Sequence, residues 1–236
     1  MKKNYEMDMC SGPILGKLLT FTIPLIFSGI LQLLFNAADV IVVGRFAGSQ
    51  SLAAVGSTTA LINLMINIFI GLSVGVNVIV ARYYGAKREK DVQDTIHTAM
   101  ALSIVSGLFL IVVGQLLSRP MLELMGTPDD VIDKSTIYMR IIFIGMPANM
   151  IYNFGSAILR AVGDTKRPLY FLTAAGVINV VLNLFFVIMF RMDVAGVALA
   201  TAISQAISAC LVILCLMESE GGLKLHLKAL KIHRSK

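Results

Sequence analysis

The sequence predicts an all-α polytopic membrane protein with six transmembrane helices. Charged residues make up 14% of the 236 residues, against about 25% in an ordinary soluble domain. Apolar residues reach 57% and the mean hydropathy is +0.82. A soluble globule cannot bury so much apolar surface and still cover itself with polar groups. Apolar runs of roughly 20 residues, the length that a helix needs to cross a bilayer, recur along the chain.

Six charge-poor runs predict the spans, and short polar loops separate them. A segment near the N-terminus, residues 18–38, has no charge and is too long for the core of a signal peptide, so it is expected to stay in the membrane. We expect residues 1–217 to form one six-span unit and residues 218–236 to form a basic cytoplasmic tail or a linker. The expected spans are residues 14–43, 59–80, 95–118, 141–159, 169–190 and 194–217.

The net charge of +6 fits a membrane protein better than a nucleic-acid-binding one. If both termini are cytoplasmic, 15 of the 20 basic residues fall on the cytoplasmic side, as the positive-inside rule requires. Residues 121–133, which carry four acids, then form an outer loop. We therefore expect a multi-pass protein of the cell membrane with no nucleic-acid partner.

Enzymatic chemistry finds no support in the motifs. The sequence has no GxxxxGK[ST] loop for ATP, no HExxH pair and no GxSxG elbow. Cys10, Cys210 and Cys215 form neither a CxxC pair nor a zinc-binding spacing. The sequence thus predicts no catalytic residues, no cofactor and no structural metal site.

Asp39 is the one acidic residue within an expected span. A carboxylate at membrane depth costs on the order of 3 kcal/mol, so such residues usually face a cavity and handle protons or cations. Gln32 and Asn36 precede it at helical spacing and share its helix face. The alternative is an acid at the membrane interface that pairs with Arg45.

Further polar residues predict a pocket around that face. Asn179 and Asn183 lie one turn apart in the fifth expected span, Asn153 lies in the fourth and Thr201 lies in the sixth. Taken singly, each is more simply explained as a hydrogen bond between helices. Together with Asp39 they predict a polar pocket that holds a proton, a small cation or a cationic ligand. Pro24 lies inside the first span, where a missing backbone hydrogen bond predicts a kink or hinge.

Four segments resemble the MATE family, the multidrug and toxic compound extrusion transporters. Residues 24–39 (PLIFSGILQLLFNAAD) look like the first MATE span, and residues 159–168 (LRAVGDTKRP) look like the loop before the fifth. Residues 178–183 (INVVLN) and 194–201 (VAGVALAT) resemble the fifth and sixth spans. The four segments follow one another in the family's order over nearly the whole chain.

The resemblance implies an antiporter that exports organic cations in exchange for protons or sodium ions. It assigns the cation-binding acid to Asp39 and the surrounding site to Asn179, Asn183 and Thr201, with Asn153 as a looser match. It also makes Pro24 the point at which the first span bends. Asn183 stands where many relatives carry Asp, so one carboxylate is expected here, and a sodium ion at Asp39 remains one alternative to a proton.

The family has two six-span lobes, and this chain resembles the first of them. The resemblance therefore implies one lobe of a twelve-helix transporter, in the bilayer, with a missing C-terminal lobe or a second copy as its partner. Two alternatives stay open. The chain could be a homodimerising or inert six-span component without transport of its own, or it could belong to the lipid and polysaccharide exporters of the same superfamily.

Overall fold

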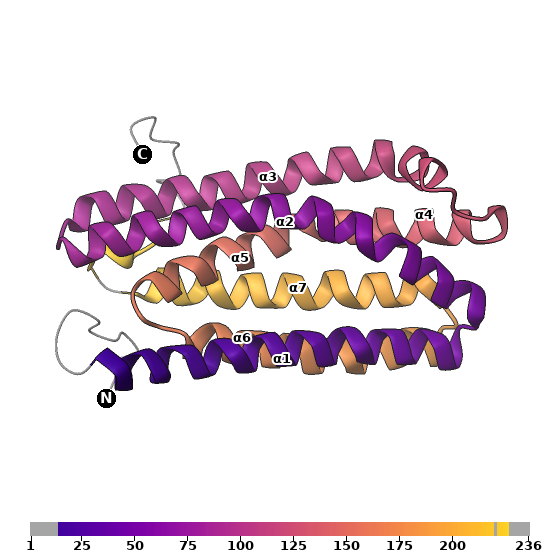
Figure 1. Cartoon of the computed structure of the whole chain (residues 1–236), viewed down its shortest axis with the longest axis horizontal. Helices are drawn as coiled ribbons and strands as arrows, with labels where there is room; N and C mark the ends of the chain where they lie inside the picture. The colour runs from indigo at the N-terminus through magenta and orange to yellow at the C-terminus, as the bar shows by residue number, and fades with distance from the viewer. Residues whose placement is uncertain (1–13, 220, 227–236) are drawn as a thin grey trace.

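A computed structural model describes residues 14–219 and 221–226, which form an elongated bundle of helices without a strand (Figure 1). The bundle is built from seven α-helices, one π-helical segment and a short 3-10 turn. In chain order they are α1 (Ile14–Phe46), α2 (Ser49–Gly85), α3 (Glu89–Leu124), α4 (Asp129–Ile144), α5 (Met146–Ala161), α6 (Lys166–Leu184), η1 (Phe185–Met189), α7 (Asp193–Glu218) and η2 (Gly221–Leu223).

The helices confirm a polytopic membrane fold. Five segments are long and apolar enough to cross a membrane: α1, α2, α3, α6 continued by η1, and α7. The pair α4 and α5 meets the same test together, with a bend of 48° between them, and makes a sixth span if it is counted as one. α1 begins and α7 ends at the same end of the bundle (Figure 1).

The fourth span differs from the sequence prediction. It was expected as one helix over residues 141–159, whereas the structure has two helices that meet at Gly145. Pro147 lies in the first turn of α5 and cannot donate a backbone hydrogen bond to α4, so the helix breaks there. Gly107 of α3 lies so close to Pro147 that a side chain at position 107 would collide with it.

Most helices also extend further than the apolar runs. α2 begins at Ser49 instead of residue 59, and a hydroxyl group in the added part is satisfied within the helix. Thr58 donates to the carbonyl oxygens of Ala54 and Val55, at 3.0 and 2.9 Å. Residues 121–133, expected as a loop, instead hold the last turn of α3 and the first turn of α4.

A buried carboxylate fixes the connection between α5 and α6. Gly163 adopts the left-handed region, with φ of +85°, and allows the chain to leave α5. Asp164 is fully buried and accepts hydrogen bonds from the backbone N–H groups of Lys166 and Arg167, at 3.2 and 3.1 Å. It also forms an ion pair with the Arg167 guanidinium. These contacts supply acceptors for the free N–H groups at the start of α6.

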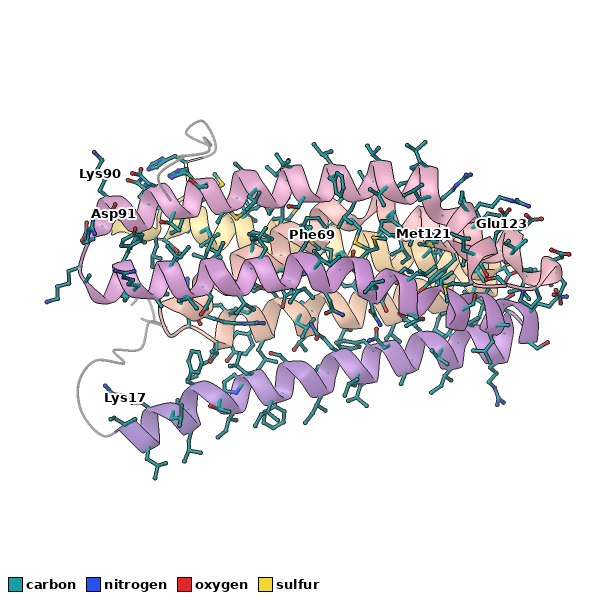
Figure 2. All side chains as sticks on the ribbon, turned by 45° about the horizontal axis from the view of Figure 1, so that its top comes forward. Lys17, Phe69, Lys90, Asp91, Met121 and Glu123 are labelled. Carbon is teal, nitrogen blue, oxygen red and sulfur yellow. The ribbon has the colours of Figure 1, made fainter. Side chains whose placement is uncertain are left out.

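The side chains along the outside of the bundle are apolar, as a lipid-facing surface requires. In Figure 2, Lys17, Lys90 and Asp91 lie at one end of the bundle and Glu123 lies at the other. Leu33, Ile68 and Leu116 are each more than 60% exposed between those ends. The apolar surface that a soluble protein would bury is therefore directed outward.

α1 is the least enclosed helix. It runs beside α6 (Figure 1) and buries four of its 33 residues, Pro24, Ser28, Val42 and Val43. Gln32 and Asn36 are exposed on the same helix. One side of the bundle core is therefore covered by a helix that has few other neighbours.

Candidate functional site

A cavity of about 400 Å³ lies inside the bundle between α1, α2, α4, α5, α6 and α7. Its wall carries twelve amide, hydroxyl or carboxyl side chains besides two tyrosines, in a bundle that is otherwise mostly apolar. The polar wall residues are Gln32, Asn36, Asp39, Thr59, Asn63, Asn149, Asn153, Asn179, Thr201, Ser204, Gln205 and Ser208, of which Asp39 is the one that carries a formal charge.

A chain of hydrogen bonds links Asp39 of α1 to α6 and α7. The amide nitrogen of Asn183 donates to Oδ1 of Asp39 and, at 3.2 Å, to Oδ1 of Asn179. Asn179 in turn donates to Oγ1 of Thr201 at 3.2 Å. Thr201 donates to the backbone carbonyl of Val197 at 3.0 Å. The chain of bonds therefore joins α1 to two helices that come much later in the sequence.

Asn183 leaves one acceptor without a partner. Its side chain is fully buried, and both amide hydrogens are used by Asp39 and Asn179. Its carbonyl oxygen Oδ1 accepts no hydrogen bond in the described part of the chain. A buried acceptor beside a carboxylate is an arrangement that a cation would complete, because a proton or a hard metal ion binds oxygen ligands.

The donor set suits a monovalent ion or a proton better than a transition metal. Among the described residues, no group of three His, Cys, Asp or Glu side chains is placed to share a metal ion. One carboxylate with amide and hydroxyl oxygens matches the oxygen ligands of hard cations and lacks the thiolates and imidazoles that zinc and copper prefer.

Gly176 allows α1 and α6 to approach closely enough for these bonds. A Cβ atom at this position would overlap the ring of Phe35, which lies against α6. Phe35 precedes Asp39 by one turn of α1, and Gly176 precedes Asn183 by two turns of α6. The close packing of ring and glycine therefore sets the distance between the carboxylate and its amide partner.

A π-helical segment begins two residues after Asn183. η1 covers Phe185–Met189, and the backbone N–H of Met192 donates to the carbonyl oxygen of Phe186 at 3.1 Å. Such segments widen the helix locally and recur at functional sites. Here η1 follows directly on α6, the helix that carries Asn179 and Asn183.

The structure brings most of the sequence-predicted residues together. Gln32, Asn36 and Asp39 line the cavity from one face of α1, as their spacing predicts. Among the described residues, the polar partner of Asp39 is Asn183, and no ion pair joins Asp39 to Arg45. The alternative of an interfacial Asp39–Arg45 pair is therefore not the arrangement observed.

Asn153 and Pro24, like Gln32 and Asn36, lie apart from the hydrogen-bonded chain. Asn153 lines the cavity, but its amide donates to Asn149, at 2.9 Å to both the backbone and the side-chain oxygen. Pro24 is buried in α1 at a distance from the cavity wall, and α1 continues through it as one helix. The carbonyl oxygen of Pro24 accepts a hydrogen bond from Ser28 at 2.8 Å.

Sequence reasoning missed Tyr138 and Phe35. Tyr138 of α4 lines the cavity and is 8% exposed, yet it precedes the residues that were expected to form the fourth span. Phe35 was read as one more apolar residue of the first span. The i, i+4 spacing from Phe35 to Asp39 could have placed the ring on the cavity face.

Comparisons with known proteins identify the family of this chain. The MatE family model matches residues 24–185. A probable multidrug resistance protein of Bacillus subtilis, YoeA, is 35% identical over 188 residues, which are 78% of this chain and 41% of that protein. A Shewanella oneidensis protein named FAD transporter is 27% identical over 205 residues, or 85% of this chain and 45% of that protein.

The fold matches solved structures over nearly the whole chain. A crystal structure of a MATE protein in the bent conformation aligns with a TM-score of 0.85 at 24% identity, covering 93% of this chain and 49% of that one. The chain thus spans about half the length of the relatives that it matches. The chain belongs to the MatE family and has the fold of one lobe of a MATE transporter.

Proposed function

We propose that this chain forms the cation-binding lobe of an exporter that releases organic cations in exchange for protons or sodium ions. Its relatives are transporters, among them multidrug resistance proteins. The observation that carries the proposal is the pair formed by Asp39 and Asn183, a carboxylate beside a buried amide oxygen without a partner.

The proposed site residues divide into two groups. Asp39, Asn183, Asn179 and Thr201 form the hydrogen-bonded chain and would hold the driving cation. Gln32, Asn36 and Asn153 line the cavity beyond that chain and would contact the exported compound. A cation that binds Asp39 cancels its charge, so cation and cationic substrate compete for one carboxylate and occupy the cavity in turn.

The charge of the cavity supports organic cations over anions. No Lys or Arg lies among the residues that line it, and its one formal charge is negative. A compound with phosphate groups would meet the carboxylate without any compensating positive charge. The relative named FAD transporter therefore does not set the expected substrate class for this chain.

In the proposed cycle, α1 is the moving part. It has few neighbours besides α6, and neutralising Asp39 removes the charge that Asn183 stabilises. α1 would then repack about Pro24, the position at which its backbone hydrogen bonding is interrupted. A second lobe, or a second copy, would supply the opposite wall of the cavity.

The proposed orientation places the start of α1 and the end of α7 on the cytoplasmic side. The end where α1 begins and α7 ends carries Lys17 and the basic residues of two loops, 82–90 and 160–167. Fewer basic residues lie at the opposite end, among them Arg45, Lys134 and Arg191. The positive-inside rule then puts the N-terminal end of α1 inside the cell.

The test is equilibrium binding of labelled tetraphenylphosphonium to the purified chain in lipid nanodiscs. We expect saturable binding that other organic cations displace and that FAD does not. Binding that FAD displaces, or no saturable binding, would overturn the assignment of substrate class. Gradient-driven flux of the same probe into vesicles holding this chain alone would favour a second copy over a second lobe as the partner.

A further inference from the structure

The segment after α7 folds back onto the bundle. The backbone N–H of Leu225 donates to the carbonyl oxygen of Leu216 in α7 at 3.0 Å. Leu223 and Leu225 are buried, while Lys224 and His226 between and after them are exposed. Gly222 lies against the backbone of Glu89, the first residue of α3. Residues 221–226 are therefore docked at the end of the bundle where α3 begins and α7 ends.

A buried histidine holds the last described residue of this segment. His97 of α3 is 4% exposed, and its Nε2 accepts a hydrogen bond of 3.1 Å from the backbone N–H of His226. Its Nδ1 lies 2.8 Å from the carbonyl oxygen of Gln93, one turn earlier. The two imidazole rings stack nearly parallel, with centroids 6.1 Å apart and an angle of 8°.

These contacts fix the protonation state of His97. A backbone N–H can only donate, so Nε2 must be an unprotonated acceptor. A carbonyl oxygen can only accept, so Nδ1 must carry the proton. Both bonds are satisfied by one neutral tautomer of the ring. A second proton would sit on Nε2 and point at the backbone N–H of His226. Two donors would then face each other, and the hydrogen bond would be lost.

Acidic side chains are present at this end of the bundle, but none of the described ones is in direct contact with the His97 ring. No carboxylate forms an ion pair with this ring in the described part of the chain. The nearest ring is that of His226, and two protonated rings in a stack repel each other. The charged or titratable groups at this end include Arg82, Tyr83 and Tyr84 on α2, Lys87 and Arg88 before α3, Glu89, Lys90, Asp91 and Asp94 on α3, Arg160 on α5, Cys215 and Glu218 on α7, and Lys224 and His226 in the docked segment.

From this geometry we propose that His97 is a pH-operated clasp for residues 221–226. The neutral ring holds the segment against α3, and the protonated ring releases it. Histidine is the side chain that ordinarily changes charge between about pH 5 and 8, so cytoplasmic acidification would free the chain that leaves α7. The inference does not depend on the transport activity proposed above, because neither His97 nor the docked segment lines the cavity.

The test is amide hydrogen exchange of the purified full chain in detergent, resolved to Leu225 and His226 and corrected for the intrinsic pH dependence of exchange. Between about pH 8 and about pH 5, the range over which histidine changes charge, protection of both amides should fall. The expected fall is about tenfold, as for the loss of one hydrogen bond of ordinary strength. Equal corrected protection at the two pH values would overturn the proposal.

Two variants separate His97 from its neighbour. His97→Gln keeps an acceptor oxygen and a donor but does not titrate, so the pH step should vanish. His226→Ala removes the second ring and keeps the backbone N–H, so the step should remain. A step that survives in His97→Gln, or one that disappears in His226→Ala, would assign the titration to another group and refute the clasp. His226 is exposed, so its replacement leaves the bundle core intact.

Discussion

The contact between Gly176 and Phe35 makes a quantitative prediction about how α1 is held. A methyl group at position 176 would overlap the Phe35 ring, so Gly176→Ala must displace either the ring or α1. Overpacking of this kind costs about 1–3 kcal/mol. Gly75 lies in the middle of α2 with no atom within 4 Å of its Cβ position, so Gly75→Ala is the matched control. Both replacements gain about the same helix propensity, which cancels in the comparison.

The assay is the free energy of unfolding in detergent for a double-mutant cycle. Gly176→Ala should be less stable than Gly75→Ala by about 1–3 kcal/mol, the overpacking cost. In a Phe35→Ala background the ring is gone, so adding Gly176→Ala should cost nothing and the coupling energy should equal that same cost. A Gly176→Ala penalty that persists without the ring would refute the view that this contact sets the spacing of α1 and α6.

Two further replacements test the cation site and the connection between α5 and α6. Asn183→Leu should weaken binding of the driving cation about tenfold or more, because a hydrogen bond to a charged group contributes about 1.5–3 kcal/mol. Asn153→Leu, which changes an amide that bonds Asn149 and is assigned to the exported compound, should weaken binding of the driving cation much less, and equal losses would contradict the assignment. Asp164→Ala should lower the free energy of unfolding by about 2–3 kcal/mol, since it removes a buried carboxylate that pairs with the partly buried Arg167 and accepts two backbone N–H groups. Asp133→Ala, which removes an exposed partner of Arg119, should change stability little, and a comparable loss there would show that burial does not decide the effect.

The membrane fold and much of the cavity could be predicted from the sequence because both depend on residue type and local spacing. Apolar runs set the spans, and the i, i+4, i+7 spacing of Gln32, Asn36 and Asp39 sets one helix face. A carboxylate in an apolar run has few arrangements that avoid a large desolvation cost, so its position inside a polar cavity followed directly.

Contacts between distant segments could not be predicted in the same way. Pro147 could have indicated a helix break within residues 141–159, but its close contact with Gly107 of α3 could not be predicted, because it joins two separate helices. The stacking of His97 with His226 joins residues 129 positions apart. The sequence showed these histidines as scattered, because only the fold of residues 221–226 brings them together.

The central claim is that Asp39 is the carboxylate for which the driving cation and the organic cation compete. The most direct test is tetraphenylphosphonium affinity as a function of sodium concentration at constant pH, and separately as a function of pH. Constant pH keeps the His97 clasp in one state during the sodium titration. Glu123→Gln, which removes an exposed acid that does not line the cavity, is the control.

We expect the wild-type chain and Glu123→Gln to lose affinity for the probe as sodium or acid is added. Asp39→Asn should bind the probe more weakly and show no dependence on the competing cation. If Asp39→Asn keeps the same sodium or proton competition as the wild-type chain, the driving cation binds elsewhere, and the role given to Asp39 is contradicted.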